Sequence, residues 1–244
     1  MEMVRLKCGF VNGIDIASNG LRGGLSLGWT GSSLVSLRSY SQLHVDVDIH
    51  DNENGETWRF TRFYENPDER YKRSFWELLW QLDNDPGSPW IVLGDFNEIT
   101  SSFEKKGGRL RSERQMADFC NALEDCRLND LGYVGQWFTW ERGRFRSTNI
   151  RERLDRGVTS LNWMNLFPSY SITHLSHSFS DHCPVFMNTV GNLGRCESVG
   201  NKLFRFEAKW CLDESFEAIV QQAWADPLVS VPDKLANAGK HFQF

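Results

Sequence analysis

The chain has 244 residues, of which 40% are hydrophobic and 24% are charged. This length and composition fit one large globular domain, or one domain with an appendage, and they exclude a low-complexity chain. The net charge of −5 argues against indiscriminate binding to polyanions.

The first ten residues, "MEMVRLKCGF", mix charges with single apolar side chains and do not resemble a signal peptide. No later stretch of the sequence approaches the length needed to span a membrane. The six cysteines are scattered, with no C-x-x-C pair, which favours reduced thiols. We therefore expect a nuclear or cytoplasmic protein that is not secreted and does not bind membranes.

The first quarter of the chain has the two-residue alternation of β-strands. Four stretches separated by turn-forming residues show this pattern, at 23–29, 33–39, 42–49 and 57–64. Together they predict an antiparallel meander.

After residue 64 the apolar spacing changes to that of a helix. Asn66 is suited to cap a helix that we expect to end near Leu82, and an apolar run at 90–94 then predicts a buried strand. A second helix is predicted after Ser112, which with Gln115 has the spacing of a capping box.

The remainder of the first 190 residues alternates short strands with one helical piece. We expect strands at 151–158, 170–175 and 184–190, and a short helix between 160 and 168. Strands and helices in this order predict an α/β fold with two sheets.

A change of composition follows residue 190. Residues 191–203 form a polar linker containing Gly and Asn, and residues 204–244 include an amphipathic stretch, "DESFEAIVQQAW", which predicts a helix. We therefore predict a main domain at 1–190, a linker at 191–203 and a separate tail at 204–244.

Three short motifs carry side chains able to handle a proton or a metal. The strand in "WIVLGDFNEIT" ends at Gly94 and is followed by Asp95 and Asn97. Asp155 lies in "RERLDR", and "SDHCPV" contains Asp181 and His182. Each motif alone has an ordinary explanation: a turn, a surface ion pair or an incidental loop.

Together the three motifs occur in the order and spacing of the endonuclease/exonuclease/phosphatase superfamily, which they resemble. Further stretches, including "LRGGLSLGW", "EKKGGRLRSERQMADF" and "DLGYVGQWFTW", closely resemble the endonuclease domain of plant non-LTR (LINE-type) retrotransposon polyproteins over residues 20–190. The resemblance implies a two-sheet α/β sandwich of the abasic-site endonuclease or deoxyribonuclease I-like type. It also implies a Mg²⁺-dependent endonuclease that hydrolyses phosphodiester bonds in DNA.

The resemblance also implies roles for individual residues. Asp95 would orient and deprotonate the attacking water, and Asn97 would hold that water or a phosphate oxygen. His182 would donate to the phosphate, with Asp155 fixing its tautomer. Asp181, with Asp95, would bind Mg²⁺, or alternatively Mn²⁺, and no small-molecule cofactor is implied.

Further residues are candidates for contact with the substrate. Tyr64 matches a position that contacts phosphate in the family, although a half-buried strand tyrosine is an equal alternative. Between residues 104 and 156 there are 12 Lys or Arg against 9 Asp or Glu, an excess of 12 − 9 = 3 positive charges. In that region we expect four residues to contact DNA: Arg142, Arg144, Arg146 and Trp137. The alternatives are a solvated surface for the charges and core packing for Phe138 and Trp140.

The sequence departs from the family at its N-terminal end. Family members carry an Asn on their first strand and a metal-binding Glu on a strand shortly afterwards. Both strands precede the segment that begins here at Gly23. Asn12 and Asn19 are predicted to lie in a loop, and Glu2 is at the terminus. We therefore expect an N-terminally truncated domain with impaired activity.

Residues 204–244 resemble the connector that leads to a reverse transcriptase, but the sequence has no Tyr-x-Asp-Asp polymerase signature. Two alternatives to a DNA-nicking domain stay open: a catalytically inactive nucleic-acid-binding relic, and a small-molecule phosphatase of the same superfamily.

Overall fold

A computed structural model describes the following residues: 2–17, 24–31, 34–51, 55–64, 72–143, 145, 148–175, 180–190, 216–225 and 234. The chain divides into two compact units, residues 1–191 and residues 192–244. The second unit contains helix α5 (Phe216–Trp224), at the place where the amphipathic stretch predicts one. Among the described residues, no helix is long and apolar enough to cross a membrane.

A six-stranded sheet forms the centre of the first unit, with the strand order β3-β4-β5-β6-β12-β8. Its neighbouring strands are antiparallel, except that β5 and β6 run parallel. The strands are β3 (Leu34–Tyr40), β4 (His44–His50), β5 (Thr57–Tyr64), β6 (Trp90–Asp95), β8 (Asn129–Asp130) and β12 (Asp155–Thr159). The meander predicted for β3, β4 and β5 is confirmed.

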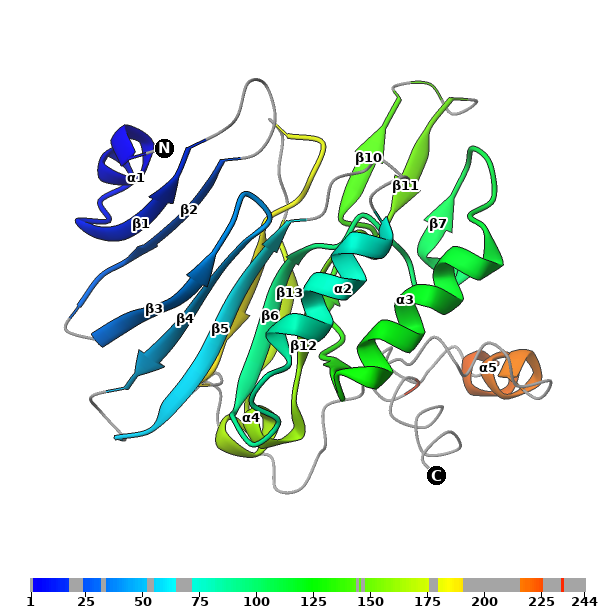
Figure 1. Cartoon of the computed structure of the whole chain (residues 1–244). Coiled ribbons are helices and arrows are strands. Elements are labelled where there is room, and N and C mark those ends of the chain that lie inside the picture. The colour runs from blue at the N-terminus through cyan, green and yellow to red at the C-terminus, as the bar shows by residue number, and fades with distance from the viewer. Residues whose placement is uncertain are drawn as a thin grey trace. The chain divides into compact units, whose positions relative to one another are not determined.

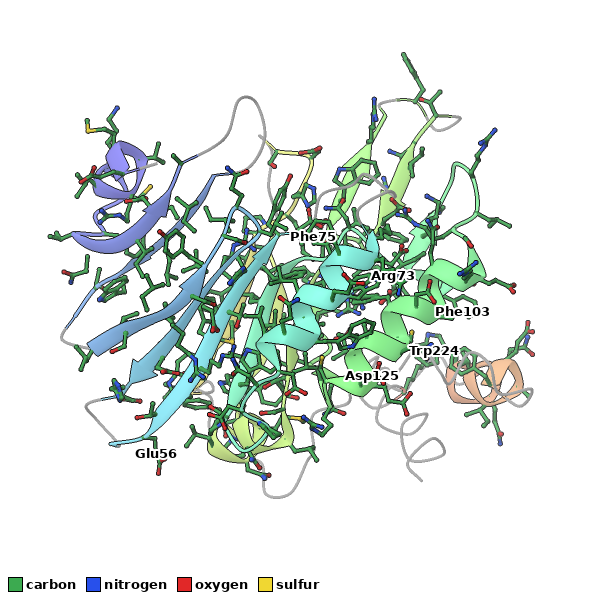
Figure 2. All side chains as sticks on the ribbon, in the orientation of Figure 1. Glu56, Arg73, Phe75, Phe103, Asp125 and Trp224 are labelled. Atoms are coloured by element: carbon green, nitrogen blue, oxygen red, sulfur yellow. The ribbon has the colours of Figure 1, made fainter. Side chains whose placement is uncertain are left out.

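Two helices cover one face of this sheet. Figure 1 shows α2 (Lys72–Leu82) and α3 (Glu113–Asp125) side by side in front of β6 and β12. Arg73 and Phe75 both lie on α2 (Figure 2), but Arg73 is exposed whereas Phe75 is buried. The Trp76 ring stacks on the Phe119 ring of α3 at 4.9 Å, so the apolar stripes of both helices pack toward the sheet.

The opposite face of the sheet is covered by a second layer of strands. One part is the sheet β14-β13-β9, from Val185–Asn188, Ser171–His174 and Val134–Gly135. The other is the hairpin of β1 (Asn12–Ile16) and β2 (Leu25–Trp29). Buried apolar side chains fill the space between the layers, joined by the short helix α4 (Leu161–Leu166). The predicted α/β fold with two packed sheet layers is confirmed.

A further three-stranded sheet lies at one end of the sandwich. It joins β10 (Trp140–Arg142), β11 (Ile150–Glu152) and β7 (Lys105–Lys106), and β7 follows the short 3-10 helix η2 (Ser102–Glu104). Figure 1 shows β10, β11 and β7 together at the top of the unit. These strands carry part of the basic region identified in the sequence.

The N-terminal residues differ from the expectation. Helix α1 (Glu2–Lys7) and strand β1 were not predicted, and Asn12, expected in a loop, is the first residue of β1. The strand forms because Ile14 and Ile16 pack against the apolar side chains of β4, and because β2 pairs along its whole length. Strand β2 therefore pairs with β1 instead of joining the meander. Asn19 lies outside the described residues.

One predicted cap and one predicted strand also differ from the structure. Ser112 precedes α3, but its side chain makes no capping hydrogen bond, so the capping box with Gln115 is wrong. The strand expected at 151–158 is divided into β11 and β12, because the chain changes sheet at Arg153 and Leu154. The expected cap at Asn66 lies outside the described residues.

At Gly94 the backbone of β6 leaves no room for a side chain beside β5. A Cβ atom at this position would lie 1.8 Å from the backbone oxygen of Phe63, which is far inside van der Waals contact. The absence of a side chain therefore allows the parallel pairing that places Tyr64 opposite Asp95.

Candidate active site

Three polar residues lie at the termini of neighbouring strands of the central sheet. Tyr64 on β5 is in register with Asp95 on β6, and Asp95 is in register with Asp155 on β12. Because residues in register point to the same face, all three side chains are directed toward the second layer of strands. The sheet thus brings together residues that lie up to 91 positions apart in the sequence.

His182 reaches the same place from the loop before β14. Its Nδ1 lies 2.7 Å from Asp155 Oδ2, and its Nε2 lies 3.9 Å from Asp95 Oδ2. Since a carboxylate oxygen accepts, Nδ1 carries the donated proton and Nε2 is left on the side of Asp95. This is the orientation that the sequence-based role of Asp155 requires.

Asn97 follows β6 and folds back on Asp95. Its backbone N–H and its side-chain Nδ2 both donate to the Asp95 carboxylate, at 2.9 and 2.8 Å. The backbone of Asn97 has φ 45°, a left-handed conformation that Asn tolerates better than most residues. Lys72 Nζ donates to the Asn97 carbonyl at 3.0 Å and fixes this turn. Residues 95–97 therefore form the turn that is the ordinary explanation of this motif, and the same turn orients the Asp95 carboxylate.

The electrostatics of the site are dominated by the two neighbouring carboxylates. Burial, and then the charge of Asp155, raise the pKa of Asp95 to about 6, against partial compensation from His182 and Arg62. Burial alone would lower the pKa of His182, but its hydrogen bond to Asp155 and the charges of both aspartates raise it overall. The negative charge of Asp95 is therefore only partly compensated by its neighbours.

A cleft of about 990 Å³ opens over these residues. The predicted site residues that line it are Tyr64, Asp95, Asn97, Arg142, Asp155, Asp181 and His182. Trp137 does not line it, and its indole N–H donates to the Phe103 carbonyl at 3.1 Å instead. Trp140, expected in the core, lines the cleft and donates to Asp181 at 3.1 Å. Arg144 and Arg146 lie outside the described residues.

The donor set fits a divalent cation in part. Asp95, Asp155 and His182 each offer a ligand atom within 4.8 Å of the others. Two carboxylates are the oxygen ligands that Mg²⁺ prefers, and the raised pKa of Asp95 indicates negative charge that a cation would neutralise. Asp181, which the sequence pairs with Asp95 as a metal ligand, lies outside this group.

Three charged residues of the cleft were missed in the sequence. Arg62 on β5, Arg111 before α3 and Glu152 on β11 also line the cleft. Arg111 pairs with Glu152 at 2.9 Å. The alternation of β5 places Arg62 on the same face as Tyr64, and this pattern could have identified it.

The basic region has a different role at its C-terminal end. Arg153 and Arg156 are buried and form ion pairs with Glu104, at 2.7 and 2.9 Å, and with Asp130, at 2.8 and 2.9 Å. The Arg156 guanidinium also lies over the Phe119 ring, 5.2 Å from its centre. These two arginines are therefore structural, and the surface explanations of this charge run are wrong for them.

A two-layered sandwich with an Asp–His pair and a second Asp at a cleft supplies the groups that hydrolysis of a phosphate ester needs. The sequence matches the endonuclease/exonuclease/phosphatase family over residues 9–182, more than half of the chain. The chain therefore belongs to this family, whose members hydrolyse phosphodiester and related bonds.

Three of the solved structures to which this chain is similar are the following. The endonuclease domain of TRAS1, a telomere-specific non-LTR retrotransposon, has a TM-score of 0.59 and 16% identity, covering 73% of this chain and 80% of its own. TDP2 from D. rerio, complexed with single strand DNA product, has a TM-score of 0.44 and 11% identity, covering 76% and 79%. The human Nocturnin catalytic domain with bound sulfate anion has a TM-score of 0.36 and 18% identity, covering 65% and 59%. No curated protein matches the sequence.

Proposed function

We propose that residues 1–190 form a Mg²⁺-dependent endonuclease domain that nicks DNA and derives from a plant non-LTR (LINE-type) retrotransposon. The observation that carries the proposal is the convergence of Asp95, Asp155 and His182 in one cleft. The stretches within residues 20–190 that resemble retrotransposon endonuclease domains support this origin. The fold shared with the TRAS1 endonuclease domain is consistent with it.

Asp95 is the proposed base. It is 5% exposed, and above pH 6 it is a carboxylate with little solvent to stabilise it, which favours taking a proton from a nearby water. Asn97 donates two hydrogen bonds to it and so fixes the direction in which the carboxylate can accept. Asp95 would thus orient and activate the attacking water.

His182 is the proposed donor to the phosphate. Asp155 holds the Nδ1 proton, so a protonated ring presents Nε2–H beside Asp95. The raised pKa of His182 increases the protonated fraction near neutral pH. Tyr64, on the other side of Asp95, lines the same cleft and is proposed to contact a phosphate oxygen.

A divalent cation would be held by Asp95 and Asp155, with Asp181 contributing through water. When bound, Mg²⁺ supplies positive charge that neutralises the phosphate and stabilises the leaving oxygen. Because Mg²⁺ keeps most of its waters and demands octahedral geometry, this small set of carboxylates is expected to bind it weakly.

The N-terminal strands, the tail and the location are also subjects of proposals. We propose that the domain works fully only with the Asn and Glu strands that the family carries, and that residues 204–244 correspond to a reverse transcriptase connector. A nuclear or cytoplasmic location would fit access to DNA.

Nicking of a supercoiled plasmid tests the proposal. We expect weak Mg²⁺-dependent nicking by the chain itself and stronger nicking after fusion to a related segment with the Asn and Glu strands. Asp95→Ala and His182→Ala should abolish it, whereas Arg114→Ala, at a side chain that is 89% exposed on α3, should not. Full activity of the unextended chain would contradict the proposed dependence on the two strands.

The two alternatives predict different results in parallel assays. A small-molecule phosphatase would release phosphate from inositol phosphates without nicking the plasmid. An inactive relic would bind DNA and cleave neither substrate, even in the extended form.

A further inference from the structure

Arg62 lies on the inner face of β5, in a row of apolar and aromatic side chains. Its neighbours on that face are Phe60, which packs between the two layers, and Tyr64, which lines the cleft. In register, Arg62 lies opposite Leu93 on β6, one pair away from the pair of Tyr64 and Asp95 along this face. The sheet therefore places a guanidinium at the floor of the cleft.

Arg62 differs from Arg111, another arginine that lines the cleft, in how its charge is paired. Arg111 forms ion pairs with Glu98 and Glu152. Among the described residues, no carboxylate lies within ion-pair distance of Arg62, and its one recorded hydrogen bond goes to the Phe63 carbonyl at 3.3 Å. Since a guanidinium has five N–H donors, most of them are available to a ligand.

The position of Arg62 also complements the rest of the site. Along the sheet, Arg62 and Tyr64 lie on β5, Asp95 on β6, and the pair of Asp155 and His182 follows at β12. Two adjacent carboxylates repel an approaching phosphate, and a cation on the opposite side from His182 offsets this repulsion. A guanidinium is well suited to this task, because its fork of donors matches two phosphate oxygens.

We propose that Arg62 binds a phosphate group of the substrate in the cleft, on the β5 side of Asp95. The inference rests on the proposed function, because it takes the ligand to be a phosphodiester. It adds a substrate-binding residue to the site formed by Asp95, Asp155 and His182.

Binding of a short DNA duplex to the full chain, measured by fluorescence anisotropy in EDTA at several KCl concentrations, tests the inference. Arg62→Ala should weaken binding about tenfold, as expected for loss of a charge-assisted hydrogen bond. It should also reduce the slope of log affinity against log salt by about one, the value for one phosphate contact. Arg62→Lys should keep the slope and lose part of the affinity, because it retains the charge without the fork.

Two further measurements make the result decisive. Arg114→Ala, which removes one positive charge from an exposed side chain that does not line the cleft, is the matched control and should change neither affinity nor slope. Thermal unfolding of each variant shows whether it is folded, and Arg62→Gln replaces Arg62→Ala if the latter is not. Unchanged affinity and slope in a folded variant that lacks the charge would overturn the inference.

The inference and the proposed function fail separately. If the chain binds DNA through Arg62 but never nicks it, including after extension, the inference stands and the endonuclease proposal falls. If the chain nicks DNA and Arg62→Ala leaves binding unchanged, the endonuclease proposal stands and Arg62 has no role in substrate binding.

Discussion

Two clusters of charge lie one residue apart at the start of β12, and they differ in how far their charges are paired. Arg153 and Arg156 are buried and pair with both Glu104, which is also buried, and Asp130, which lies at the surface. Asp155, between them, is directed into the cleft, where it lies beside a second carboxylate, Asp95.

The pKa values record this difference. Burial raises the pKa of Glu104 and of Asp130, but the two arginines lower it by more, so both carboxyls end below their usual range. In the cleft, burial and Asp155 raise the pKa of Asp95 to about 6. The paired cluster, formed by Arg153, Arg156, Glu104 and Asp130, therefore stabilises the folded state. In the cleft, the charge of Asp95 is only partly compensated, so binding of a proton, a cation or a substrate lowers the electrostatic energy.

The largest expected effect is on the paired cluster. Arg156→Met removes a cation that is 0% exposed and leaves Glu104 buried with one partner fewer. We expect the free energy of unfolding to fall by about 3–5 kcal/mol, as for breaking other buried ion pairs. Urea denaturation at pH 7 measures it.

An exposed pair is the control for this measurement. Arg151 pairs with Glu141 at 3.0 Å, but both side chains are more than 40% exposed. Arg151→Ala should cost less than about 1 kcal/mol. If Arg156→Met were equally mild, the buried network would not be a source of stability.

In the cleft, removal of a charge should raise the free energy of unfolding instead of lowering it. The pKa of Asp95 is higher in the folded than in the unfolded state, so its ionisation above pH 6 destabilises the fold. Asp95→Asn should therefore raise the free energy of unfolding by about 1–3 kcal/mol at pH 8 in EDTA, and much less at pH 4. Chemical denaturation at both pH values checks this, and a loss of stability at pH 8 would contradict the assigned electrostatics.

Acid should lower the free energy of unfolding through the paired cluster. Because the folded pKa values of Glu104 and Asp130 are depressed, their stabilisation is complete above pH 5 and is lost progressively as the pH falls below about 4. We expect a decrease of about 1–2 kcal/mol between pH 5 and pH 3 that is smaller in Glu104→Gln. Thermal unfolding across this range measures it, and an equal decrease in the variant would assign the effect to other groups.

The smallest effect on stability is expected from the arginines between residues 142 and 146. Replacing Arg142, Arg144 and Arg146 with Ala should change the free energy of unfolding by less than about 0.5 kcal/mol. The same change should flatten the salt dependence of DNA binding if these residues contact phosphates. An unchanged slope would favour a solvated surface for this group.

Much of this arrangement was accessible from the sequence, because local patterns determine it. Alternation of apolar residues predicted β3, β4 and β5, and the end of the apolar run at Gly94 placed Asp95 at a strand terminus. Neither pattern indicates which residues meet across the sheet. The expectation that Asp95, Asp155 and His182 lie together came from the motifs in combination, and their chemical roles stay predictions.

The parts that were missed depend on partners distant in sequence. Arg153 and Arg156 look like surface charges in a basic run, and only the fold brings Glu104 and Asp130 to them. Strand β1 was missed because five residues with one Gly give little periodicity without β2 beside them. Similarly, Ser112 has the composition of a capping residue, but the conformation of its side chain is set by its surroundings.

Gly94 contributes to the site through the close backbone contact with Phe63 that it allows. It carries no functional group, but any larger residue there would force β5 away from β6, because the Phe63 carbonyl occupies the space of the missing side chain. Tyr64 and Arg62 would then move away from Asp95, although every reactive group would still be present in the chain. Designers who transplant this site to another scaffold would have to reproduce the narrow strand spacing along with the polar side chains.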